Sequence, residues 1–304
     1  MSLGSRAGSS VWWEAARPRT LPAAVAPVLV ASALAWRDGG FQISAALICL
    51  AFSLLIQIGT NFANDYYDFV KGADTVERVG PRRAVAAGLI APLVMRRAMI
   101  GVFVVAFLVG LALLPFGGWP LLIVGVTSIV CGVLYTGGPY PLAYHGWGDV
   151  FVFVFFGLVA VTTTYFVQCG SISEEAWVMG VGIGALATNI LVVNNYRDIE
   201  TDRKAGKRTL VVRWGRGFAQ IQFIFAHLLT ILSVVLLWQR GYLGDGGTAA
   251  LSIFLLIVAL FQLMKLRRSE SALELIALLG STGRHVALTA VFMAVALVWS
   301  GQVR

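Results

Sequence analysis

Charged residues are scarce in this chain of 304 residues. Only 12% of the residues are charged, 58% are hydrophobic, and the mean hydropathy is +0.82. A chain of this length with so few charged residues cannot cover the surface of a water-soluble globule. The composition therefore excludes a soluble protein and predicts one that uses the lipid bilayer as its solvent.

Cysteine and histidine are also few, with three of each. They are scattered without the spacing of a metal site, and the cysteines lie within or at the ends of apolar segments. Such isolated residues are typical of packing positions, so neither a redox centre nor a histidine and cysteine metal site is expected.

Two further patterns are missing: the alternation of a β-barrel and a cleavable signal segment. Long apolar windows recur instead, most of them close to the roughly 20 residues that a membrane-spanning helix needs. They predict an all-α, polytopic membrane protein, a bundle of about nine transmembrane helices over residues 11–304 behind a disordered tail at 1–10. Pro22 and Pro27 are expected to kink the first span. The windows are 21–36, 43–62, 98–114, 119–135, 150–167, 177–193, 218–237, 248–264 and 286–299.

The basic residues give the orientation. Of the 23 Lys and Arg, all but Arg37, Arg240 and Arg304 fall in the amino-terminal segment or in loops on one predicted side of the membrane. Because cytoplasmic loops carry an excess of Lys and Arg, this side is expected to be cytoplasmic. The protein is therefore predicted to be a multi-pass protein of the cell (inner) membrane.

An acidic run ends the second predicted span and reads Asn64-Asp65-Tyr66-Tyr67-Asp68. If the helix continues past the membrane boundary, the four-residue spacing puts Asn64 and Asp68 on one face. Gly72 then allows a turn that brings Asp74 back towards this face.

A second acidic run ends the sixth predicted span, on the same side of the membrane. Asn194, Asp198 and Asp202 stand at successive four-residue steps and form one polar stripe. Carboxylates at a membrane boundary are costly unless something compensates them. Two such stripes therefore indicate a functional site.

Carboxylate oxygens at the edge of a helical bundle suit Mg²⁺, which readily shares its coordination shell with phosphate oxygens. The residue types thus predict a site where divalent ions bridge carboxylates to a diphosphate. Basic residues in the same loops would stabilise the charge of a departing diphosphate. These are Lys71, Arg78, Arg82, Arg83, Arg203, Lys204, Lys207 and Arg208.

At this point the chain resembles the UbiA superfamily of intramembrane prenyltransferases, which has nine transmembrane helices and two aspartate-rich motifs. The first motif is written N-D-x-x-D-x-x-x-D, and Asn64, Asp65 and Asp68 fit it. Position 72 is Gly, a departure from the general pattern, and the acid follows as Asp74. That spacing is similar to the menaquinone-pathway branch that uses 1,4-dihydroxy-2-naphthoate. Further stretches similar to this branch are residues 17–21, 78–85, 195–202 and 206–210.

The resemblance implies transfer of a polyprenyl group from a polyprenyl diphosphate to 1,4-dihydroxy-2-naphthoate, with loss of CO₂, to give demethylmenaquinone. Asp65, Asp68, Asp198 and Asp202 would promote ionisation by holding Mg²⁺, the expected cofactor, with Asn64, Asp74 and Asn194 as further ligands. Membrane lipid is an expected partner and nucleic acid is not. Residues implied in substrate binding are Asn64, Lys71, Arg82, Arg83, Tyr135, Tyr140, Asn194, Lys207, Arg208, Arg17 and Arg19.

Some of these assignments have a structural alternative. The run from Tyr135 to Pro141 is rich in Gly and Pro and is typical of a turn, although the resemblance implies that Tyr135 or Tyr140 lines the site. Phe151, Phe155 and their neighbours are typical of lipid contact or helix packing, or they could stabilise an allylic cation. Arg17 and Arg19 could meet the carboxylate of the acceptor.

Other functions remain open. Within the superfamily, the acceptor could instead be 4-hydroxybenzoate or homogentisate. A secondary transporter would also have many helices and intramembrane polar residues, but its carboxylates are expected near the bilayer midplane. A soluble-type isoprenoid synthase could not have so apolar an exterior, and a structural membrane protein has no need of two matched acidic stripes.

Overall fold

The computed structural model describes residues 8–74, 80 and 82–302, and every regular element within them is helical. The elements are α1 (Ser9–Ala16), η1 (Pro18–Thr20), α2 (Pro22–Arg37), α3 (Ile43–Val70), α4 (Pro92–Leu111), α5 (Leu114–Gly117), α6 (Pro120–Leu134), η2 (Leu142–His145), α7 (Gly148–Phe153), η3 (Val154–Val159), α8 (Ala160–Cys169), α9 (Glu174–Lys204), α10 (Leu210–Gln239), α11 (Asp245–Arg268) and α12 (Ala272–Gln302).

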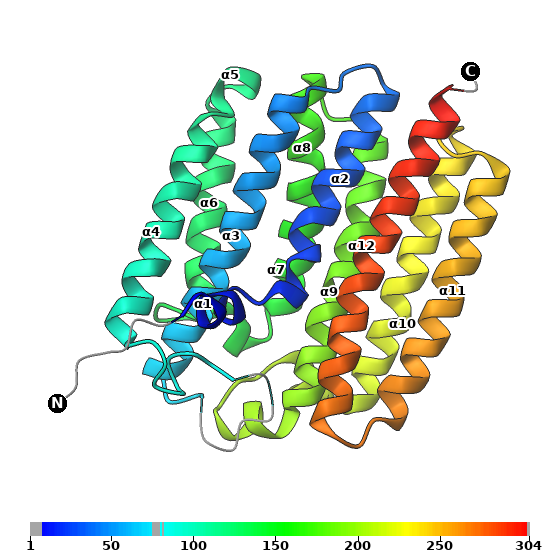
Figure 1. The fold of residues 1–304 in the computed structure, drawn as a ribbon. Helices are drawn as coiled ribbons and strands as arrows, with labels where there is room; N and C mark the ends of the chain where they lie inside the picture. The colour runs from blue at the N-terminus through cyan, green and yellow to red at the C-terminus, as the bar shows by residue number, and fades with distance from the viewer. Residues whose placement is uncertain (1–7, 75–79, 81, 303–304) are drawn as a thin grey trace.

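The helices form one bundle whose long members run side by side (Figure 1). Each predicted apolar window lies in a helical segment, so the all-α fold is confirmed. The count of nine spans is not. Among the described residues, seven helices are long and apolar enough to cross a membrane, and an eighth span results if α1 to α2 is counted as one bent span. The remaining window, α6, has only 15 residues.

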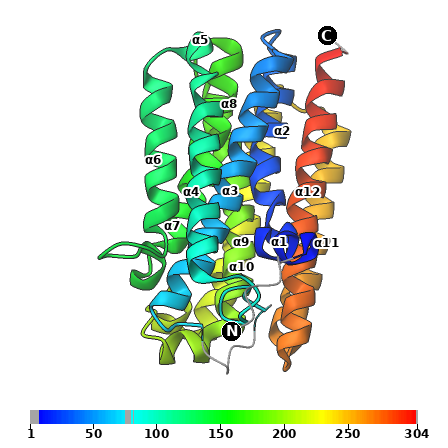
Figure 2. The same cartoon turned by 60° about the vertical axis from the view of Figure 1, so that its left-hand side comes forward.

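The loops after α3, α6, α9 and α11 meet at one end of the bundle, which we call the basic end because most Lys and Arg lie there (Figures 1 and 2). In the second view α4 and α6 lie on one side and α11 and α12 on the other, with α2 and α3 between them.

Helix α1 lies across the basic end of the bundle, and the chain bends by 54° between it and α2. Arg17 at the bend has a φ of 54°, an uncommon conformation for a residue other than glycine. The bend precedes Pro22, which begins α2 and needs no helical N–H partner there, whereas Pro27 lies within α2. Of the predicted disordered tail, residues 1–7 lie outside the described residues, while Ser9 and Ser10 belong to α1.

A π-helical turn, η3, separates α7 from α8 and brings the backbone close to α9. A Cβ atom added to Gly157 would collide with the carbonyl oxygen of Gly180 and the Cα of Gly184. Only glycines allow the two backbones to approach so closely. This contact sets the position of α7 and α8 against α9, which carries the second acidic motif.

We expect Gly157→Ala to lower the thermal unfolding temperature of the detergent-purified protein clearly, because the backbone of α9 cannot move aside as a side chain can. Gly101→Ala is the matched control, since Gly101 lies within α4 and a Cβ there meets nothing within 4 Å. That change should be neutral or stabilise by up to about 1 kcal/mol. Equal unfolding temperatures for the two variants would contradict the packing argument.

Candidate functional site

A cavity of about 260 Å³ opens inside the bundle near the basic end. Asn64 and Asp68 line it from α3, and Asn194, Asp198 and Asp202 line it from α9. Both helices extend beyond the apolar windows, to Val70 and Lys204, as the spacing predicted. The two acidic motifs, distant in sequence, therefore share one cavity.

Asp68 lies at the centre of the polar network, with its side chain only 2% exposed. Its Oδ2 accepts hydrogen bonds from Arg83 Nη2 at 3.2 Å and from Lys207 Nζ at 3.1 Å. Its Oδ1 accepts one from the Tyr144 hydroxyl at 2.8 Å. Two cations and a phenol thus surround one buried carboxylate, which balances the charge on the α3 side of the site.

Tyr144 is a site residue that the sequence analysis missed. It comes from η2, and its ring lies beneath Lys71 Nζ and Lys207 Nζ, 5.0 and 4.8 Å from the ring centroid. Burial, together with the negative charge and hydrogen bond of Asp68, raises the pKa of Tyr144 above its usual range. The phenol therefore remains a hydrogen-bond donor to Asp68 throughout the physiological pH range. No spacing rule connects η2 with α3, so the sequence held no signal for this contact.

On the α9 side, Arg197 holds the second motif. Its Nε and Nη2 donate to the two carboxylate oxygens of Asp198 at 2.7 and 2.6 Å, and Nη2 also donates to Asn194 Oδ1 at 2.9 Å. Both charged side chains are almost fully buried. Arg197 Nη1 and Arg83 Nη1 are buried and have no hydrogen-bond acceptor in the described part of the chain. Each motif thus carries a cation with a donor atom left over for an anion.

Two predicted acidic ligands do not face the cavity. Asp65 accepts hydrogen bonds from the backbone N–H groups of Ala84 and Val85, so in this structure it orders the loop that carries Arg83. Asp74 returns after the turn at Gly72, as expected, but its carboxylate lies 3.6 Å from Arg83 Nε and does not line the cavity. These two carboxylates lie away from the cavity because backbone N–H groups hold Asp65 and Arg83 holds Asp74. Helical spacing does not predict such tertiary contacts.

The predicted substrate-binding residues divide into two groups. Those lining the cavity are Arg17, Asn64, Arg83, Tyr135, Asn194 and Lys207. Those outside its lining are Arg19, Lys71, Arg82, Tyr140 and Arg208.

The residues outside the lining have other surroundings. Tyr140 is half exposed and stacks on His145, with ring centroids 3.7 Å apart. Arg82 forms an exposed ion pair with Glu14. Lys71 Nζ donates to the Thr136 carbonyl at 2.8 Å and lies over the ring of Tyr144. These two contacts keep Lys71 near the site. Arg78, also predicted near the diphosphate, lies outside the described residues.

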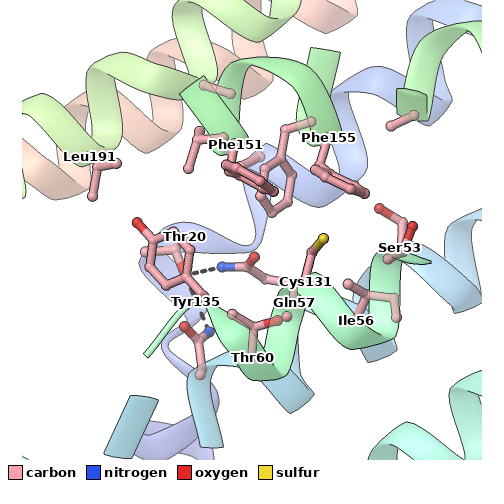
Figure 3. Close-up of a pocket in the computed structure, with 18 of the residues that line it drawn as sticks. Thr20, Ser53, Ile56, Gln57, Thr60, Cys131, Tyr135, Phe151, Phe155 and Leu191 are labelled. Carbon is pink, nitrogen blue, oxygen red and sulfur yellow. Dashed lines mark hydrogen bonds between the residues drawn. The ribbon is translucent and has the colours of Figure 1, made fainter. Parts of the chain in front are cut away.

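Beyond the polar end, the cavity becomes apolar and continues between the helices. Phe151 and Phe155 lie on one side of it with their rings stacked, and Gln57, Cys131 and Tyr135 face them from the other side (Figure 3). Further lining residues include Leu113, which follows α4, and Leu121, which lies in the first turn of α6, and both are at the end of the bundle opposite the basic end. The cavity thus joins a charged head region to a long apolar channel.

A small polar patch lies between these regions. Gln57 Nε2 donates to Thr20 Oγ1 at 3.0 Å, and Asn61 Nδ2 donates to the Ala16 carbonyl at 2.9 Å. Thr20 Oγ1 donates in turn to the Arg17 carbonyl. These bonds fix the bend after α1 and hold Arg17 at the cavity wall.

The donor atoms present are of the type that Mg²⁺ prefers. Carboxylate and amide oxygens from α3 and α9 line the charged end of one cavity. Within the described residues, however, no three acidic, histidine or cysteine side chains are grouped closely enough to form a metal site on their own. Arg83, Lys207 and Arg197 compensate the carboxylates instead. The residues therefore fit Mg²⁺ in the kind of donor atom, and donors from both acidic motifs line the same cavity.

Taken together, the fold and the site define a multi-pass membrane protein with an internal anionic and cationic cavity joined to an apolar channel. A family model described as the UbiA prenyltransferase family matches residues 24–281. The chain therefore belongs to the UbiA prenyltransferase family.

The relatives agree with this assignment. A 1,4-dihydroxy-2-naphthoate octaprenyltransferase of Mycobacterium leprae is 37% identical over 296 residues, 96% of this chain and 97% of that protein. One of Escherichia coli is 42% identical over 213 residues, 68% of this chain and 69% of that protein. The solved structure of a UbiA homolog from Archaeoglobus fulgidus bound to GPP and Mg²⁺ is 14% identical and covers 95% of this chain and 99% of its own, with a TM-score of 0.68. This last similarity supports the fold.

Proposed function

We propose that this protein transfers a polyprenyl group from a polyprenyl diphosphate to 1,4-dihydroxy-2-naphthoate, with loss of CO₂, to give demethylmenaquinone in its reduced, quinol form. The observation that carries the proposal is the single cavity in which Asp68 from α3 and Asp198 and Asp202 from α9 meet above an apolar channel. Relatives named for this activity, of which one is 37% identical across nearly the whole chain, support the choice of acceptor.

The charged end of the cavity suits the diphosphate. Asn64, Asp68, Asn194, Asp198 and Asp202 would hold Mg²⁺, which when bound would offset the charge of the diphosphate and make it a better leaving group. The A. fulgidus homolog bound to GPP and Mg²⁺ supports this cofactor. Arg83 and Lys207 already lie at Asp68, where they can donate to diphosphate oxygens as the C–O bond breaks.

The apolar channel suits the isoprenoid chain, because each buried methylene group favours binding. When the C–O bond breaks, its electron pair leaves with the diphosphate and an allylic cation remains. The stacked rings of Phe151 and Phe155 line the cavity in which such a cation would form. Their π faces can stabilise the positive charge of the cation. The electron-rich ring of the acceptor then forms the new C–C bond, and its carboxylate leaves as CO₂, returning an electron pair to the ring.

The acceptor is expected beside the polar patch. Arg17 lines the cavity there, next to Thr20, Gln57 and Asn61, so its guanidinium is suited to the acceptor's carboxylate. Asp65 and Asp74 would support the site through the loop that carries Arg83 rather than by facing the substrates. The gathering of Lys and Arg at the basic end supports a cytoplasmic active site in the cell (inner) membrane.

The test offers purified protein a mixture of 1,4-dihydroxy-2-naphthoate, 4-hydroxybenzoate and homogentisate, with prenyl diphosphates of several lengths and Mg²⁺. Mass spectrometry should find prenylated, decarboxylated naphthoquinol as the main product, and EDTA should stop its formation because the diphosphate then keeps its full charge in the cavity. Product from another acceptor would overturn the choice of acceptor. Transport into liposomes without any product would overturn the enzyme assignment.

A further inference from the structure

Two arginines at the edge of the bundle have no function in the site described above. Arg19 in η1 and Arg284 in α12 are both exposed, and neither has an acidic partner or a side-chain hydrogen bond within the described residues. Most exposed cations can orient freely towards water. Arg19 is held in place by the packing of η1 on α12.

The contact between η1 and α12 depends on two glycines. A Cβ atom at Gly283 would collide with the Arg19 carbonyl oxygen, and one at Gly280 would lie 3.7 Å from Arg19 Cδ and 3.9 Å from Nε. The Arg19 side chain thus lies flat on α12 at Gly280. Arg284 follows Gly280 by four residues and shares its face of the helix. Arg284 therefore begins one helical turn beyond the point where the Arg19 side chain crosses α12, on the same face of the helix.

The depth of this pair places it near the membrane boundary. Arg284 is twelve residues after Ala272, the start of α12, or about 18 Å along the helix. Helix α1 packs on α3 and leads directly into η1, which packs on α12, and its Trp13 is 61% exposed. Tryptophan is enriched at the level of lipid headgroups. An exposed arginine so far into a spanning helix is costly unless its charge reaches the interface or binds an anion.

An apolar stripe leads away from the arginines along the same helix. Leu288, Val291 and Val295 follow Arg284 at helical spacing, and all three are exposed. The stripe continues into an apolar groove between α2 and α12 that Val295, Val298 and Trp36 help to line. Basic groups at the interface above a continuous apolar track match the shape and chemistry of a phospholipid.

We propose that Arg19 and Arg284 bind the phosphate of an anionic membrane phospholipid, whose acyl chain lies along Leu288, Val291 and Val295. The excess of positive charge around the pair, at the basic end, favours an anionic lipid over a zwitterionic one. A lipid bound there also holds η1 against α12. Arg17 just before η1, Thr20 at its end and Leu279 on α12 line the cavity, so the lipid would stabilise one wall of the cavity.

The test measures lipid retention by native mass spectrometry after exchange into mixed phosphatidylglycerol and phosphatidylcholine. The wild type should retain phosphatidylglycerol. Retention by the double variant Arg19→Gln/Arg284→Gln should fall by at least about tenfold. Arg268→Gln is the matched control, because Arg268 is an exposed arginine at the end of α11 on the same side of the bundle, and it should behave as wild type. Thermal unfolding in each lipid checks that the variants are folded.

Three outcomes would overturn the proposal. The first is equal phosphatidylglycerol retention by the double variant and Arg268→Gln. The second is equal retention of phosphatidylcholine and phosphatidylglycerol by the wild type. The third is displacement of the lipid by geranyl diphosphate, which would assign the arginines to an incoming diphosphate substrate. None depends on the identity of the acceptor, so the proposed reaction can fail while the lipid site stands.

Discussion

Replacing Asp68 by Asn is expected to lower the rate of prenyl transfer by at least about 10²–10³-fold. This carboxylate alone meets Arg83, Lys207 and Tyr144, so its loss removes a metal ligand and the group that positions both cations. It also leaves Lys207 beside a neutral amide and Arg83 with Asp74 as its remaining carboxylate, which we expect to cost a few kcal/mol of stability. Product formation and thermal unfolding should both be measured.

Tyr144→Phe separates these effects. It removes one hydrogen bond to Asp68 but keeps the charge balance with Arg83 and Lys207, so the rate should fall by only about tenfold. The thermal unfolding temperature of Tyr144→Phe should be close to that of the wild type. If Asp68→Asn kept near wild-type turnover, the role proposed for this carboxylate would be wrong. If Tyr144→Phe lost as much activity as Asp68→Asn, the phenol would have to act directly on the substrates.

Replacing Arg197 by Gln should destabilise the protein strongly when no divalent ion is present. Arg197 pairs through two hydrogen bonds with Asp198, and both side chains are almost fully buried. Removing one partner of a buried pair costs about 3–5 kcal/mol, because the remaining charge loses its main compensation. Mg²⁺ with a non-reactive prenyl diphosphate analogue should recover more stability in the variant than in the wild type, since bound cation replaces the lost charge.

Arg203→Gln provides the control for this experiment. Arg203 pairs with Glu200 at 3.0 Å, but both side chains are more than half exposed. Such a pair contributes about 1 kcal/mol or less, so the unfolding temperature should hardly change, with or without Mg²⁺. An Arg197→Gln variant as stable as the wild type in EDTA would show that Arg197 does not compensate Asp198. If Mg²⁺ and the diphosphate analogue did not raise the unfolding temperature of Arg197→Gln more than that of the wild type, a metal at Asp198 would be contradicted.

The acidic motifs were the most predictable part of the site. Asn194, Asp198 and Asp202 follow a four-residue repeat, and a helix must place such residues on one face whatever surrounds it. The same rule placed Asn64 and Asp68 together. The rule did not apply to Asp65, whose role as a metal ligand came from the resemblance alone, and its carboxylate accepts hydrogen bonds from backbone N–H groups of a loop some twenty residues later. Helical periodicity gives the face on which a side chain lies, but it does not give the groups from elsewhere in the chain that bind that side chain.

The basic residues were harder to assign for a related reason. Arg83 and Lys207 lie at Asp68, whereas Arg82 and Arg208, their neighbours in sequence, point to the surface. Composition and charge cannot separate adjacent arginines in a loop, because the loop has no fixed period. Tyr144 had no signal at all, since its role depends on the contact of η2 with α3.

The sequence by itself determined that the chain is a membrane-embedded helical bundle with two acidic stripes at its basic end, because burial in lipid and helical periodicity act locally and need no knowledge of neighbours. Only the tertiary structure decided which cations neutralise those stripes, that α6 is short and α1 lies across the bundle, and that Arg19 packs on α12 rather than in the cavity. These features depend on contacts between residues far apart in the chain, where close approach at glycines and competition for buried charge select one arrangement.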